Sequence, residues 1–192
     1  MKPRTLMIAI ALIAALAVGV GAVLLGPTGT DQTRAYTVPG LDPMTMDEAQ
    51  TAFYRITPAL LLVVYDAFGR TGEADIYDTL ARVAGADALE QLYLERVGAM
   101  AGGGLEEADQ TIHEIKLLTS SLDTAGDALV IDASWQVIGT VGHAEHLHVR
   151  GNTYSADLTI APVDEAWKIT AFELLDVNRD TAGETFLAPQ TD

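Results

Sequence analysis

An uninterrupted apolar stretch lies near the start of the chain. Residues 6–25 contain no charged or strongly polar side chain. As a helix at about 1.5 Å per residue they would span roughly 30 Å, the thickness of a bilayer's hydrocarbon core. Lys2 and Arg4 precede this stretch, and basic residues mark the cytoplasmic end of a membrane helix. We therefore expect residues 1–26 to be a signal anchor, a single-pass transmembrane helix in the bacterial cytoplasmic (inner) membrane. The N-terminus would lie inside, and the rest of the chain in the periplasm or outside.

The alternative to a retained anchor is a cleaved secretory signal. Such signals have apolar cores of about 7–15 residues and a small-x-small cleavage site, and Val20-Gly21-Ala22 could serve as one. The length of the apolar stretch favours retention, so residues 6–25 are expected to contact the lipid bilayer. Small residues recur every fourth position at Ala11, Ala15 and Gly19. That spacing lets a second helix approach closely, so a transmembrane or homo-oligomeric protein partner is a further expectation.

Two regions of different character follow the apolar stretch. Residues 27–43 are rich in Gly, Pro, Thr and Asp, a composition that predicts a linker. Apolar residues then recur at helical spacing in residues 45–68 and again in 76–100, which predicts two helical stretches. Pro58 interrupts the first stretch, and it is expected either to kink the helix or to start a second one. Three consecutive glycines end the helical part.

After these glycines the apolar period changes from helical to extended. Apolar and polar residues alternate along four segments separated by short polar turns, a pattern typical of strands in an antiparallel meander. The segments are residues 111–122, 129–141, 146–161 and 167–177. Residues 179–192 are polar and are expected to form a frayed tail.

The third of these segments contains a reversal of the alternation. Leu147 and Val149 are apolar at odd positions, whereas the apolar residues from Tyr154 to Ile160 occupy even positions. A straight strand keeps one parity on each face. The reversal therefore predicts a β-bulge near Gly151-Asn152, which would let Leu147 and Leu158 both face the helices.

Helices followed by an antiparallel meander predict an α+β domain over residues 44–178, with helices packed on one face of a curved antiparallel sheet. The order of elements and the long bent strands resemble the NTF2-like (SnoaL/ketosteroid-isomerase-type) cone fold. Four stretches also resemble an uncharacterised group of bacterial membrane-associated proteins: residues 76–81, 92–95, 146–154 and 161–170. The resemblance implies a fold and no particular activity.

The charge of the chain restricts its partners. Two of the 11 basic residues precede the apolar stretch, so the part after it has nine basic and 27 acidic residues, a net charge of −18. Such a field repels phosphate backbones, and no nucleic acid is expected as a partner. The chain has no cysteine, which excludes disulfides and attachment to lipid through an N-terminal cysteine.

Three of the four histidines fall within six residues. On an extended strand His146 and His148 would project to one face about 7 Å apart, near enough to share a metal ion. His143 or Glu145 could supply a third ligand, and neutral imidazole suits Zn²⁺, Cu²⁺ or Ni²⁺. A solvated strand face or a dimer contact would explain the same residues without a metal.

The resemblance to the cone fold also implies a pocket between helices and sheet. Trp135 and Tyr154 are expected to face it from strands and Tyr65 from a helix. No pairing of a nucleophile with a base can be read from the sequence, so no cofactor and no enzymatic activity are expected. The leading function is a membrane-tethered, extracytoplasmic accessory or interaction module. The alternatives are a metal-binding periplasmic module and, third, a domain with a pocket for a small apolar ligand.

Overall fold

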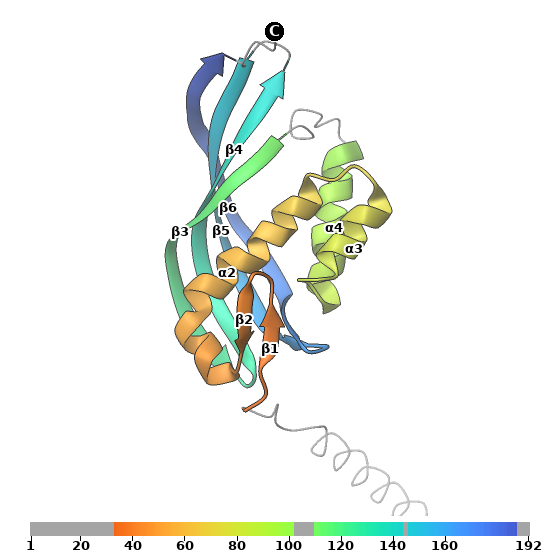
Figure 1. Cartoon of the computed structure of the whole chain (residues 1–192), viewed down its shortest axis with the longest axis vertical. Coiled ribbons are helices and arrows are strands. Elements are labelled where there is room, and N and C mark those ends of the chain that lie inside the picture. The colour runs from red at the N-terminus through yellow and green to blue at the C-terminus, as the bar shows by residue number, and fades with distance from the viewer. Residues whose placement is uncertain (1–32, 102–109, 144–145, 188–192) are drawn as a thin grey trace, which may run out of the picture. The chain divides into compact units, whose positions relative to one another are not determined.

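The computed structural model describes residues 33–101, 110–143 and 146–187, which form three helices and six strands (Figure 1). The expected anchor, residues 1–26, lies outside the described residues. In chain order the elements are β1 Tyr36–Val38, β2 Leu41–Met44, α2 Met46–Phe68, α3 Glu73–Leu80, α4 Ala86–Ala101, β3 Gln110–Ala125, β4 Ala128–His143, β5 His146–Val163 and β6 Ala166–Leu187. The prediction of an α+β fold is therefore confirmed.

Helix α2 begins at a capping box. Thr45 precedes the helix, and its hydroxyl accepts a hydrogen bond from the Glu48 backbone N–H at 3.4 Å. In return the Glu48 carboxylate accepts one from the Thr45 backbone N–H at 2.8 Å. The acidic side chains of Asp47 and Glu48 also lie at the positive end of the helix dipole. The helix continues past Pro58 to Phe68 without a second start.

The apolar face of α2 forms the core together with the sheet. Residues of α2 that are fully or almost fully buried include Ala49, Ile56, Leu60, Leu61, Val64 and Ala67. On β4 the odd positions are buried and pack in the same cluster, namely Leu129, Ile131, Ala133, Trp135 and Val137. We call this side of the sheet, on which α2 packs, the inner face. Among the described residues α2 is also the one helix long and apolar enough to cross a membrane, and its apolar face is the one packed on the sheet.

The sheet is mixed rather than wholly antiparallel. Its strand order is β2-β1-β6-β5-β4-β3, and β1 pairs with β6 in parallel through Thr37 and Ala166. The other neighbouring strands pair antiparallel. The expectation of an antiparallel sheet is thus wrong for one pair. Sequence alternation cannot reveal that pair, because it joins segments far apart in the chain.

Part of the segment that the composition assigned to a linker, residues 27–43, forms β1 and most of β2 instead. Tyr36 and Met44 are buried, and both contact Trp167 of β6. The Trp167 indole N–H donates to the Met44 carbonyl at 3.0 Å, and the Tyr36 ring meets the indole edge-on at 5.8 Å. Strands of three and four residues are too short to show an alternation, which is why the sequence pattern did not reveal them.

At the other end of the domain, β6 continues to Leu187, well into the residues expected to be a frayed tail. Its backbone pairs with β5 as far as His146, the register partner of Leu187. Hydrogen bonding to a neighbouring strand orders a polar segment that has too few apolar residues to predict a strand.

The predicted β-bulge is present at the expected place but on the neighbouring strand. The pairing of β4 with β5 shows no shift from Leu129 to His143. Between β5 and β6 the register shifts between Gly151 and Thr153, and the extra residue lies in β6. Because β5 itself gains no residue relative to β4, Leu147 and Leu158 occupy positions of opposite parity. The side chain of Leu147 is outside the described residues, so the expectation that both leucines face the helices stays a prediction.

The register shifts in this part of the sheet all arise from additional residues in β3 and β6, the two strands that flank the β4–β5 hairpin. Strand β6 has four register shifts against β5, and β3 has two against β4. A bulge adds length to one strand and bends it, so the flanking strands curve relative to the regular pair between them. Figure 1 shows the long strands curving, with α2 lying along them.

Two helices receive a cation at their C-terminal end from another element. Neither α2 nor α3 has a basic residue in its last turn. Arg96 of α4 donates from Nη2 to the carbonyl of Arg70 at 3.4 Å, just beyond α2. Lys168 of β6 donates from Nζ to the carbonyl of Ala81 at 2.8 Å, at the end of α3. Positive charge at a helix C-terminus is stabilising, so these contacts join helices to their neighbours.

Glu48 is expected to make the domain sensitive to acid. Hydrogen bonds from the backbone N–H and then from the hydroxyl of Thr45 hold the pKa of the Glu48 carboxyl below its ordinary value of 4.5. A depressed pKa contributes stability that is present above the unfolded pKa and is lost as the pH falls through the folded one. Glu48→Gln should therefore lower the melting temperature near neutral pH and converge with wild type in acid. Melting curves by circular dichroism across this range test it, and a difference that persists unchanged in acid would contradict it.

Candidate functional site

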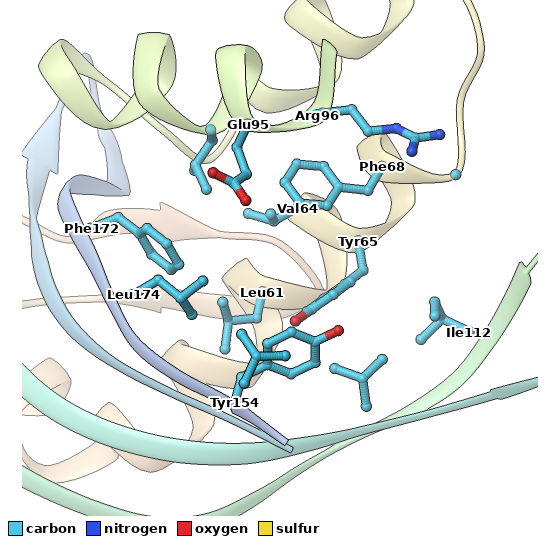
Figure 2. Close-up of a pocket in the computed structure, with 14 residues that line it drawn as sticks. Leu61, Val64, Tyr65, Phe68, Glu95, Arg96, Ile112, Tyr154, Phe172 and Leu174 are labelled. Carbon is cyan, nitrogen blue, oxygen red and sulfur yellow. The ribbon is translucent and has the colours of Figure 1, made fainter. Parts of the chain in front are cut away.

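A cavity of about 170 Å³ lies between α2, α4 and the inner face of the sheet (Figure 2). Most of the side chains that line it are aliphatic or aromatic. They come from both helices and from four strands: Leu61, Val64, Tyr65, Phe68, Gly69, Leu92, Glu95, Arg96, Ile112, Val137, Tyr154, Phe172, Leu174 and Val177. The cavity is thus an apolar chamber with a few polar groups, which is the usual character of a small-molecule site.

Three aromatic residues build one wall of this cavity. Tyr65 of α2 and Tyr154 of β5 line it, and their ring centroids are 5.9 Å apart. Trp135 of β4 lies behind them, 1 % exposed, with its ring stacked on Tyr154 at 5.9 Å and 17°. Its indole N–H donates to the Tyr65 hydroxyl at 3.2 Å. The structure therefore brings together the three residues that the sequence named for a pocket.

The Tyr154 hydroxyl also has a polar neighbour on its own strand. Asn152 donates from Nδ2 to this oxygen at 3.4 Å. Asn152 lies between the two residues at which the β5–β6 register shifts, and its side chain reaches the candidate site. Hydrogen bonds of this kind hold the two tyrosine rings in place at the wall of the cavity.

Sequence reasoning missed the two charged residues of the cavity, Glu95 and Arg96 of α4. Arg96 is only 5 % exposed. It follows Leu92, which is also buried, by four residues, so the two lie on one face of the helix. A charged residue on the apolar stripe of a helix was the signal that could have identified it.

A larger and more open groove adjoins the cavity. It has a volume of about 620 Å³ and shares Tyr65, Gly69 and Ile112 with the cavity. Arg70 and Arg82 line the groove together with Asp66. Arg70 pairs with Asp66 at 3.0 Å, and both side chains are largely exposed. The groove thus brings two arginines and one aspartate next to the cavity, among apolar side chains such as Leu62 and Val63.

The histidines predicted as metal ligands lie at the far end of the β4–β5 hairpin. His143 and His146 are register partners, and His148 is the partner of Val141. The structure describes the backbone of these residues and not their side chains, and Glu145 is outside the described residues. Elsewhere in the described part of the chain no group of three His, Asp or Glu side chains is placed to hold a metal ion. Metal binding at His143, His146 and His148 stays a prediction.

The hydrogen bond between Tyr65 and Trp135 is expected to stabilise the domain. Tyr65→Phe removes the hydroxyl that accepts a hydrogen bond from the buried Trp135 indole N–H, and an unsatisfied buried donor costs about 1–3 kcal/mol. Urea unfolding of the variant should show a loss of this size. Tyr54→Phe is the matched control, because Tyr54 is on the same helix and is 55 % exposed. Equal effects of the two substitutions would contradict the prediction.

Comparison with known proteins identifies no family for this chain. No family model and no curated protein matches it. Three solved structures show a limited likeness. The intermembrane space region of the chloroplast protein ARC6 has 15 % identity over 64 % of this chain and 95 % of its own, with a TM-score of 0.43. A de novo designed β-sheet protein has 12 % identity over 72 % and 95 %, with a TM-score of 0.33. RPA3114, a SEC-C motif containing protein from Rhodopseudomonas palustris, has 14 % identity over 73 % and 99 %, with a TM-score of 0.35. At these scores the likeness supports no conclusion about family or function.

Proposed function

We propose that this chain is a membrane-tethered, extracytoplasmic accessory module that works by binding a small, mainly apolar ligand. The observation that carries the proposal is the cavity of about 170 Å³ between α2, α4 and the inner face of the sheet. Residues 6–25 would provide the tether to the inner membrane, and a second transmembrane helix or a second copy of the chain would be the protein partner. An NTF2-like cone, the fold that the sequence resembles, would hold its ligand between helices and sheet in the same way.

Among the described residues that line the cavity, four have polar or charged side chains, namely Tyr65, Glu95, Arg96 and Tyr154. The Tyr65 hydroxyl accepts a hydrogen bond from Trp135, and the Tyr154 hydroxyl accepts one from Asn152. These hydrogen bonds fix the two tyrosine rings in the wall against which a ligand would pack.

The volume of the cavity limits the apolar part of the ligand. An apolar cavity of about 150 Å³ in a protein interior admits benzene. The cavity here is of similar size, so it would hold one six-membered ring or a short alkyl chain. Any larger part of the ligand would extend into the adjoining groove.

Filling the cavity is expected to weaken ligand binding. The probe is 3-phenylpropan-1-ol, a neutral molecule with one aromatic ring, added to the full chain in phosphatidylcholine nanodiscs. Leu174→Phe places a larger side chain in the lining and should weaken binding by about tenfold or more, equivalent to about 1.4 kcal/mol. Equilibrium dialysis against empty nanodiscs measures the affinity, and tryptophan fluorescence, to which Trp135 beside the cavity and the distant Trp167 both contribute, gives a second readout of occupancy.

Leu175→Phe is the matched control, since Leu175 is the next residue, is 53 % exposed and does not line the cavity. It should bind the probe as wild type does. Failure of wild type to bind, or equal loss in both variants, would overturn the proposed ligand site.

A second candidate function, metal binding, is favoured by the register of the β4–β5 hairpin. His143 and His146 are direct partners across the two strands, and Cα atoms of such partners are about 4.5–5.5 Å apart. His148 follows two positions later. Together with Glu145 these residues would suit Zn²⁺, Cu²⁺ or Ni²⁺.

The metal hypothesis predicts uptake of one Zn²⁺ or Cu²⁺ per chain. Affinity should fall below about pH 6, because imidazole must lose its proton to coordinate. Binding should raise stability by about 2.7 kcal/mol at a hundredfold excess over Kd. Replacing His146 and His148 by Ala should remove both effects, as measured by titration calorimetry and melting. High salt is the control, because it screens loose association with the acidic surface. Equal binding by wild type and the double variant in high salt would exclude the site.

A further inference from the structure

Arg96 is a buried cation without a carboxylate partner in the described residues. Its side chain lines the cavity and is 5 % exposed. Ion pairs in the described part of the chain join Arg34 to Glu165 and Arg70 to Asp66, and neither includes Arg96. Nη2 donates to the Arg70 carbonyl at 3.4 Å, whereas Nε is buried with no hydrogen-bond partner.

A buried charge is costly unless it is paired and hydrogen-bonded. The C-terminal end of α2 offsets part of this cost, because its carbonyls carry partial negative charge. This contact accounts for one of the five N–H donors of the guanidinium. Nε of Arg96 stays without a hydrogen-bond partner in the described part of the chain. The full positive charge of the guanidinium is opposed only by the partial negative charge of a carbonyl, so the described residues of the site supply no counter-charge for it.

The surroundings of Arg96 show where a counter-charge would enter. The guanidinium lies beside Phe68, near the end of α2, whereas Tyr154 lies at the opposite side of the cavity (Figure 2). The adjoining groove is lined by two further guanidinium-bearing residues, Arg70 and Arg82, and only Asp66 opposes them there. In a chain of net charge −16, this end of the cavity is a locally cationic approach.

Glu95 is the opposing charge within the cavity. It is exposed, and its carboxylate points toward the space between Val64 and Phe172 (Figure 2). An anionic group placed beside Glu95 would be repelled by this carboxylate, whereas one placed at Arg96 would be attracted. The two charges therefore favour one orientation of an amphiphile, with its anionic end toward Arg96 and its neutral end toward Tyr154.

We infer that the ligand is a small amphiphile whose apolar body fills the cavity and whose compact oxyanion, a carboxylate or phosphate, pairs with Arg96. The inference rests on the proposed ligand-binding function and names the class of ligand. The planar guanidinium presents paired donors that match both oxyanions.

The test compares probes that share one phenylpropyl body and differ in their head group. They are 3-phenylpropionate, 3-phenylpropyl phosphate, the neutral methyl ester of the acid, and 3-phenylpropan-1-ol. Each is dialysed against the full chain in phosphatidylcholine nanodiscs. Wild type should bind at least one of the two anions about tenfold more tightly than the neutral probes, and the preferred anion identifies the head group. The preference should persist in high salt, because a buried pair is screened less than a surface one.

Arg96→Gln should abolish the preference for the anion, so that the anionic and neutral probes bind the variant with similar affinities. Arg96→Lys should retain part of the preference for the anionic probe. If Arg96→Gln does not fold, a reduced preference in Arg96→Lys is the result that supports the inference, and an unchanged preference contradicts it. Arg55→Gln is the matched control, because Arg55 is exposed on α2 and does not line the cavity. Equal binding of charged and neutral probes by wild type, or a preference that survives Arg96→Gln, would overturn the inference and leave the ligand site intact. Binding of no probe would overturn both.

Discussion

The curvature of the sheet around α2 is the constraint on which the rest of the domain depends. The β4–β5 hairpin is regular, whereas its neighbours β3 and β6 carry the extra residues of every register shift between these four strands. Curved flanking strands let one sheet contact α2 along its length and also reach α4. Odd positions of β4, such as Ile131 and Trp135, then meet the buried face of α2.

The cavity follows from the same geometry. It lies where α2 and α4 both face the sheet, and its walls therefore come from two helices and from β3, β4, β5 and β6. Tyr65, Trp135 and Tyr154 hold one another by stacking and by a hydrogen bond, which fixes the wall of the chamber before any ligand binds. Such preorganisation reduces the entropic cost of binding. The charged side chains Glu95 and Arg96 come from α4 alone, so the position of this helix sets the polarity of the site.

Local patterns in the sequence predicted the elements that are long and periodic. The capping residues Thr45 and Glu48 and the apolar spacing after them indicated α2, and strict alternation indicated β4. The short strands β1 and β2 were missed because they hold too few residues for a period. The bulge near Gly151 was predicted on β5, whereas the extra residue lies in β6. A change in the apolar pattern indicates that a register shift is present but does not show which of the two paired strands contains the extra residue. Parity placed Trp135 and Tyr154 on the inner face, but Arg96 was overlooked because only apolar residues were counted on its helix.

The cations at the ends of α2 and α3 bear on the order in which the chain assembles. Arg96 lies 26 residues after the carbonyl it contacts, and Lys168 lies 87 residues after its own. Neither helix therefore encodes, within its own segment, the charge that its C-terminus requires. As separate peptides both helices would lose this contribution, and the second would regain it only after β6 has joined the sheet. Part of the stability of α3 thus depends on β6, in the C-terminal half of the chain, which couples this helix to the folding of the sheet.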